Sequence, residues 1–109
     1  MKYKYISASN AATNGVAIGA DNQDVTVLKI IFGTPGDGEY VELHNIINPV
    51  AGATTNMVAK VTQPTAAAGK DWVREVNFGE KGVRLGEGGN VVTDSNQVTV
   101  LWDLTANVK

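Results

Sequence analysis

Hydrophobic and polar residues alternate at every second position in several short stretches of the chain, which is the period of a half-buried β-strand. Two long stretches are residues 71–78, DWVREVNF, and 97–104, QVTVLWDL. Their apolar faces carry Trp72, Arg74, Val76 and Phe78 in the first, and Val98, Val100, Trp102 and Leu104 in the second. We expect both faces to point into the core, with the charged end of Arg74 reaching water at the rim of a sheet. Residues 71–104 are therefore predicted to form the spine of the fold.

Residues 24–32 predict a third strand, with apolar residues on both of its faces. One face carries Leu28, Ile30 and Phe32, and the other carries Val27, Lys29 and Ile31. A strand with two apolar faces is usually central in a sheet or covers an interface with its second face.

The turn sequence GTPGDG at 33–38 follows, and residues 39–46, EYVELHNI, alternate again. This arrangement predicts a hairpin, because the proline and the glycines suit a tight turn between two strands. We expect Val41 and Leu43 to point inward, and Tyr40, Glu42 and His44 to point outward.

Shorter strand patterns occupy residues 2–6, 15–19, 57–61, 82–86 and 90–97, with a turn signal at nearly every boundary. Many short strands roughly ten residues apart are typical of a β-sandwich or small barrel. The sequence therefore predicts an all-β fold, a single-domain antiparallel β-sandwich over residues 1–109. We expect a jelly-roll-like arrangement, with an immunoglobulin-like sandwich as the alternative. Residues 1–20 are small, polar and weakly patterned, and are predicted to form an extended N-terminal arm.

The composition narrows the function classes. With no cysteine among 109 residues, the chain has no disulfides and no thiolate metal site. Its formal net charge of −2 offers no basic surface for nucleic acid. No apolar run reaches the roughly 20 residues of a membrane span, and no signal peptide is evident. We expect a soluble protein that binds neither nucleic acid nor membrane.

Candidate catalytic residues do not form a recognisable pattern. The single histidine, His44, falls on the polar face of a predicted strand, which favours a surface or interface position. The serines Ser7, Ser9 and Ser95 lie in turn-like segments without a nucleophile-elbow sequence. The carboxylates that could pair for glycoside chemistry are Asp37, Glu39, Glu42, Asp71 and Glu75. Each of these is explained as a turn residue or as part of the solvated face of a strand.

Ligand-binding patterns are equally sparse. Asp21 and Asp24 lie close together, but the spaced acidic pattern of a calcium loop is missing. The glycine-rich residues 79–90 lack the adjacent lysine-serine pair of a phosphate-binding loop, so we expect these glycines to permit turns. We expect no catalytic residues, no cofactor-binding residues, no metal ligands and no cofactor.

The strand DWVREVNF, the following FGEKGVRLGEGGNVV and the closing strand QVTVLWD together resemble the small β-sandwich structural proteins of tailed bacteriophages. The resemblance implies a non-enzymatic virion protein. It would be a capsid decoration or cement protein that binds and stabilises the lattice of the major capsid protein, or a small head or tail accessory protein. Its partner would be the major capsid protein or another virion protein. It further implies a homo-oligomer, a trimer or dimer, located on the capsid surface and soluble before assembly.

Two other functions stay open from the sequence. A carbohydrate-binding or host-attachment module would stack sugars on exposed aromatic side chains. The candidates are Trp72, Trp102, Tyr3, Tyr5 and Tyr40. The tryptophans lie on apolar strand faces, which favours core packing for both. A small hydrolase or isomerase would need His44 and a carboxylate to converge in a pocket.

Overall fold

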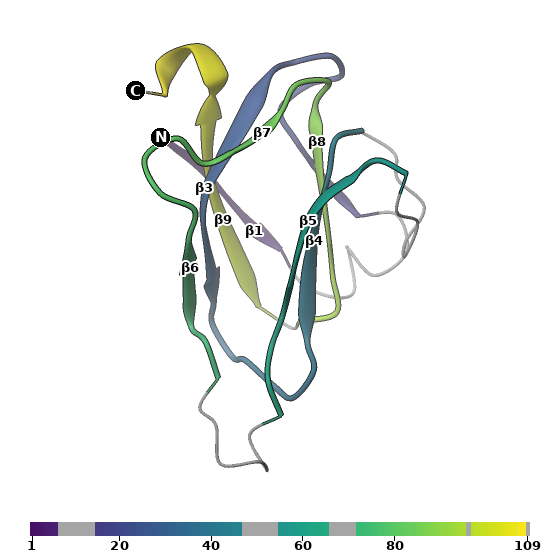
Figure 1. Ribbon diagram of the computed structural model, residues 1–109, viewed down its shortest axis with the longest axis vertical. Helices are drawn as coiled ribbons and strands as arrows, with labels where there is room; N and C mark the ends of the chain where they lie inside the picture. Colours follow the sequence, from purple (N-terminus) through teal and green to yellow (C-terminus); the bar gives the residue numbers. More distant parts are fainter. Residues whose placement is uncertain (7–14, 47–54, 66–71, 96, 109) are drawn as a thin grey trace.

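The computed structural model describes residues 1–6, 15–46, 55–65, 72–95 and 97–108, which form two antiparallel sheets packed face to face (Figure 1). The first sheet has the order β1 (Lys2–Ile6), β9 (Val98–Leu104), β3 (Val25–Phe32) and β6 (Glu75–Asn77), and β7 (Val83–Leu85) also pairs with β3. The second sheet has the order β2 (Val16–Ile18), β8 (Gly89–Thr93), β4 (Tyr40–His44) and β5 (Met57–Thr62). A short 3₁₀ helix, η2 (Thr105–Asn107), follows β9.

The strand pairing is that of a jelly roll. Early strands pair with late ones in nested order: β1 with β9, β2 with β8, β3 with β6 and β7, and β4 with β5. Successive pairs alternate between the two sheets, and the contacts β3–β9 and β4–β8 close each sheet. This topology corresponds to a long hairpin that is rolled up on itself. It is the topology of a jelly roll and differs from that of an immunoglobulin sandwich. The predicted all-β, jelly-roll-like sandwich is confirmed.

The predicted N-terminal arm contains two of these strands. Residues 2–6 pair with β9 and residues 16–18 pair with β8. Residues 7–14, which connect them, lie outside the described part of the chain.

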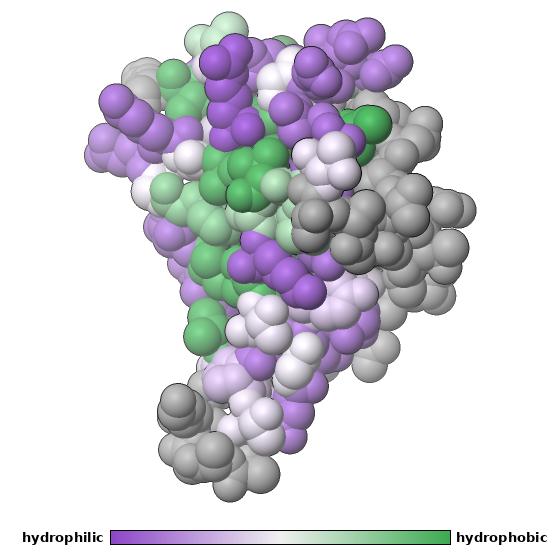
Figure 2. Space-filling view, turned by 45° about the vertical axis from the view of Figure 1, so that its right-hand side comes forward, coloured by the Kyte–Doolittle hydropathy of each residue, from purple (hydrophilic) through white to green (hydrophobic). Residues whose placement is uncertain are grey.

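The core lies between the two sheets and is formed by the inward faces of seven strands. Its buried members include Ile6, Ile18, Val25, Val27, Ile30, Phe32, Val41, Leu43, Leu85, Val91, Val98, Val100 and Trp102. The inward faces predicted for residues 97–104 and for Val41 and Leu43 are therefore confirmed. Partly buried hydrophobic residues of β5, β6 and β7 pack against this core at its margin. On the side that Figure 2 turns toward the reader, a hydrophobic area occupies the middle of the described surface, with hydrophilic side chains above it.

A β-bulge explains why β3 looked apolar on both faces. The register of β3 against β9 shifts between Val27 and Lys29. Val25 and Val27 are core residues before the shift, and Ile30 and Phe32 are core residues after it. The prediction that Val27 faces away from Ile30 and Phe32 was therefore wrong, because the extra residue of a bulge reverses the alternation.

The bulge also divides the neighbouring strand into two. β7 pairs with β3 before Leu28 and β6 pairs after it. Gly82, between the two short strands, adopts a φ of +65°, and a Cβ there would lie 2.5 Å from the carbonyl oxygen of Val27. Glycine is thus required for the close approach of the two backbones.

The inward position predicted for Trp72 was wrong. β6 begins only at Glu75, so the period of two does not extend back to Trp72 or Arg74. The Trp72 side chain is 37% exposed, and its indole N–H donates to Asp37 Oδ1 at 2.9 Å. Only Val76 and Phe78 from that predicted face pack against the core.

Candidate functional site

The outer face of the first sheet carries a surface of aromatic, apolar and charged side chains. Directly opposed residues of antiparallel strands share a face of the sheet. The register aligns one row across four strands: Tyr3, Leu101, Lys29 and Asn77. A second row is aligned in the same way: Tyr5, Thr99, Ile31 and Glu75. We call these two rows, together with Met1, the outer surface.

Three large side chains of the outer surface are strongly exposed, all from the N-terminal strand or next to it. Tyr3 is 77% exposed, Tyr5 is 58% exposed and Met1 is 76% exposed. Single exposed hydrophobic residues are ordinary, but three within five positions on an edge strand form a patch. Aromatic residues and methionine are enriched where proteins bind other proteins.

An open groove of about 710 Å³ lies against Met1 and against Leu101, the residue opposite Tyr3. It is lined by Met1, Leu28, Lys29, Asn77, Gly79, Glu80 and Leu101. The bulge in β3 contributes to it, because Leu28 lines this groove instead of joining the core. Sequence reasoning named Tyr3 and Tyr5 as candidate residues but missed the groove, because apolar residues on both faces of β3 predicted a central strand or an interface rather than a bulge.

The charges on the outer surface are arranged in pairs. Lys29 Nζ lies 3.0 Å from Glu75 Oε1. The N-terminal ammonium lies 3.5 Å from Asp103 Oδ2, which fastens Met1 beside β9. Desolvation raises the pKa of Asp103. Hydrogen bonds from the Leu104 N–H and Asn107, together with the ammonium, outweigh this effect, so the net shift of the pKa is downward.

His44 and Glu42 meet on the outer face of the second sheet. Both are only 1% exposed, and His44 Nε2 lies 2.9 Å from Glu42 Oε1. Lys60 Nζ lies 3.5 Å from the other carboxylate oxygen. The predicted surface position of His44 was wrong, because alternation tells which face a residue occupies but not whether that face is covered.

Hydrolysis with His44 as the base would need a nucleophile and a free carboxylate beside it. No described residue supplies either group at this pair. Ser95 is buried and lies beyond the end of β8, beside the Tyr40 end of β4, whereas His44 is at the opposite end. Ser7 and Ser9 lie outside the described residues. The carboxylate of Glu42 is held between two basic groups, which is the arrangement of a charge-paired structural site.

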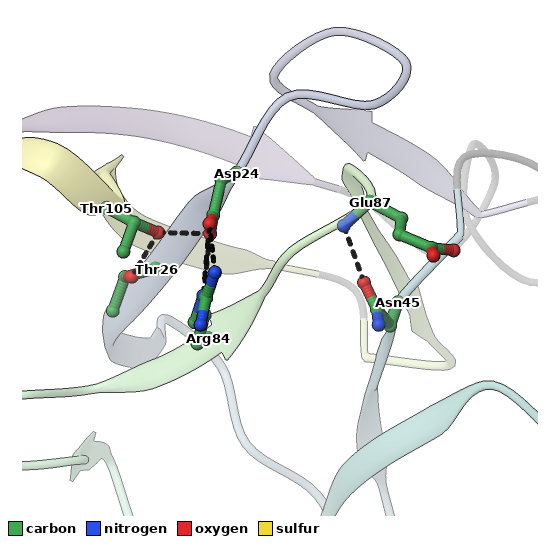
Figure 3. A network of polar contacts seen from close by, with 6 residues as sticks. All are labelled: Asp24, Thr26, Asn45, Arg84, Glu87 and Thr105. Carbon is green, nitrogen blue, oxygen red and sulfur yellow. Dashed lines mark hydrogen bonds and ion pairs between the residues drawn. The ribbon is translucent and has the colours of Figure 1, made fainter.

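The acidic residues considered for calcium and for glycoside chemistry have separate partners. Asp24 accepts hydrogen bonds from Arg84 Nε and Nη2 and from Thr105 Oγ1 (Figure 3). These hydrogen bonds hold the pKa of Asp24 below its usual value of 3.8, and those from Arg84 have the larger effect, followed by the one from Thr105. A guanidinium thus occupies the side of the carboxylate that a cation would need. Asp21 is exposed.

The remaining carboxylates are dispersed over the molecule. Asp37 accepts a hydrogen bond from the indole N–H of Trp72, and Glu75 forms an ion pair with Lys29. Asp71 lies outside the described residues. Glu39 is at the turn before β4. Among the residues that the structure describes, no three acidic or histidine side chains cluster as a metal site would require.

The aromatic candidates for sugar stacking divide into buried and exposed groups. Trp102 is 9% exposed and belongs to the core, as predicted. Tyr40 is half-buried, with Lys60 Nζ 4.6 Å from the centre of its ring. Tyr3 and Tyr5 remain as exposed rings on the outer surface, and Tyr3 lies opposite Leu101 of the groove, so the outer surface is the candidate binding site.

Comparison with known proteins identifies no relative: no family model matches the chain, and no characterised protein or solved structure is similar to it. Within the described ranges, no helix has the length and apolar character to cross a membrane. The class that fold and site define is a jelly-roll β-sandwich with an exposed aromatic surface on one sheet.

Proposed function

We propose that this protein is a non-enzymatic structural protein of a virion, a decoration or cement protein that binds and stabilises the major capsid lattice of a tailed bacteriophage. The observation that carries the proposal is the exposure of Met1, Tyr3 and Tyr5 together on the outer surface. A chain of this size ordinarily buries such residues or covers them with a partner. Jelly rolls are also common among viral shell proteins, which is an argument by analogy of fold.

Repetition of the site on a lattice makes a small patch sufficient. A capsid presents many copies of one surface, and an oligomeric decoration protein would engage several copies at once. Linked weak contacts then combine, so that the overall affinity exceeds that of each contact by factors of about 10²–10⁴. The proposal includes such a homo-oligomer, with the capsid surface as its location.

Co-sedimentation tests this function directly. The open reading frames beside the gene are searched for a major capsid protein, whose assembled shells are then mixed with the purified chain. We expect the wild-type protein to sediment with the shells, and a Tyr3→Ser/Tyr5→Ser variant to stay in the supernatant. The matched control is Val58→Ser, which removes a 49% exposed apolar side chain from the second sheet. Absence of wild-type binding, or equal loss with the control, contradicts the proposal.

A carbohydrate-binding or host-attachment module is the second candidate, favoured by the position of Tyr3 beside the groove. Leu101, opposite Tyr3, lines the groove together with Asn77, Glu80 and Lys29. A ring that stacks on a sugar and polar groups that bond its hydroxyls are the usual elements of such sites. Glycan-array binding that is lost in Tyr3→Ser, without binding to shells, would select this function over the first.

A further inference from the structure

β1 has one paired edge and one open edge. In the described part of the chain, β1 pairs with β9 and stands at the end of the first sheet. The outer edge of such a strand presents unpaired backbone N–H and C=O groups, which can accept a further strand. Proteins usually protect a long open edge, so the side chains along it indicate what can approach.

The two faces of β1 differ in chemistry. Lys2 and Lys4 lie opposite Trp102 and Val100, on the face that turns toward the core. They are nevertheless exposed, whereas Ile6 on the same face is fully buried. The second sheet therefore covers only the end of β1, and two ammonium groups stand along its uncovered part.

The hydrogen-bond donors at this place have no acceptor of their own. Neither lysine forms an ion pair with a described residue. The Trp102 Nε1–H is buried without a hydrogen-bond partner among the described residues. Lys2 Nζ lies 5.8 Å from the centre of the same indole ring. A carboxylate that entered beside Lys2 would supply the counter-charge that the described residues do not provide.

A second copy of the chain does not fit this edge. If two β1 strands paired antiparallel about a two-fold axis, directly opposed residues would come from the same face. Lys2 and Lys4 would then face lysines of the other copy, and opposed like charges destabilise a strand pair. The complementary occupant is acidic.

We propose that the open edge of β1 binds an extended acidic segment of the partner protein as an additional strand. Acidic side chains of the segment lie opposite Lys2 and Lys4, and the alternating apolar side chains lie opposite Tyr3 and Tyr5. Backbone hydrogen bonds supply the affinity and the alternation of side chains supplies the specificity, as in other cases of strand addition. The inference rests on the proposed function, since it names the chemistry of the partner in the lattice.

Nuclear magnetic resonance with two peptides tests this binding. The probe is acetyl-Glu-Val-Glu-Val-Glu-Val-amide, and its comparison peptide has lysine in place of glutamate. We expect the acidic peptide to shift the amide signals of residues 2–6 and to slow their hydrogen exchange. The basic peptide should leave both unchanged. Added salt should weaken the binding of the acidic peptide, because the contacts are exposed ion pairs.

Charge-reversal variants show whether the lysines are responsible. Lys2→Glu/Lys4→Glu should raise the Kd of the acidic peptide about tenfold or more. Arg74→Glu/Lys81→Glu makes the same change in net charge at exposed positions near the opposite edge and should leave the Kd unchanged. The spectra of the free variants report whether the fold is intact. Equal binding of both peptides, shifts confined to other strands, or equal effects of the two double variants would overturn the inference.

The same variants separate this inference from the proposed function. If the wild-type protein binds shells and Lys2→Glu/Lys4→Glu binds them equally well, the inference of an added acidic strand is overturned. The proposed decoration function is then unaffected. Peptide binding at β1 without any binding to shells supports the edge site and contradicts the decoration function.

Discussion

Arg84 donates from Nε and Nη2 to the carboxylate of Asp24, with Nη2 2.6 Å from Oδ2, and so ties β7 to the beginning of β3. Thr105 joins the same carboxylate from η2 and also contacts Thr26 (Figure 3). Three segments that are distant in sequence thus meet at one half-buried acidic residue. Such a paired arrangement makes the stability of the fold depend on the charge of Asp24.

Acid should weaken this junction in a predictable direction. The pKa of Asp24 is lowered from 3.8 in the folded protein, so its contribution to stability is complete above that value and is lost as the pH falls below it. We expect Asp24→Asn to lower the Tm at pH 7, and the difference from wild type to shrink toward pH 2. Thermal melts monitored by circular dichroism across this range measure the effect. A difference that stays constant with pH would show that the charge has no role.

The two tryptophans should respond differently to truncation. Trp102→Ala empties a core position and should cost roughly 3–5 kcal/mol of unfolding free energy. Trp72→Ala removes a partly exposed ring and one hydrogen bond, and should cost about 1 kcal/mol. Urea unfolding of both variants checks the ranking. Equal costs would place Trp72 in the core, contrary to the structure.

Gly82 and Gly79 form a matched pair of turn glycines. Both have positive φ, +65° and +85°, but only at Gly82 would a Cβ meet a backbone oxygen. Gly79→Ala should cost roughly 1–2 kcal/mol for the left-handed conformation alone. Gly82→Ala should cost clearly more, because β7 must move away from the bulge in β3. Comparable losses in denaturant unfolding would remove the evidence for a tight approach.

The buried pair of Glu42 and His44 should be coupled energetically. His44→Leu leaves the Glu42 carboxylate buried without its histidine, and should cost roughly 3–5 kcal/mol. The double variant Glu42→Leu/His44→Leu removes the buried carboxylate as well and should be more stable than the single His44 variant. A double-mutant cycle in urea gives the coupling energy. Additive losses would mean that the two side chains act independently.

Local alternation predicted most of the core correctly. Val98, Val100 and Trp102 are buried on one face of β9, and Val41 and Leu43 are buried in β4. These assignments succeed because a β-strand places successive side chains on opposite faces, a property of the backbone that needs no partner. The order of turns and short strands likewise indicated a sandwich.

The candidate site was only partly accessible to this reasoning. Tyr3 and Tyr5 were recognised as candidate aromatic residues for ligand binding. The groove beside them depends on Leu28, and the bulge that places it there arises from the pairing of β3 with two other strands. A pattern read along one strand contains no information on how its neighbours are registered.

The sequence by itself determined the class of fold, the main strands and most inward faces, because these follow from local periodicity and turn chemistry. Only the tertiary structure decided three further properties. It reversed the alternation of β3 at a bulge, buried Glu42 and His44 on a face that looked solvated, and left Lys2 and Lys4 uncovered on the core face of β1. Each depends on which surface lies across from a residue, and that is a property of the packed sheets rather than of the strand.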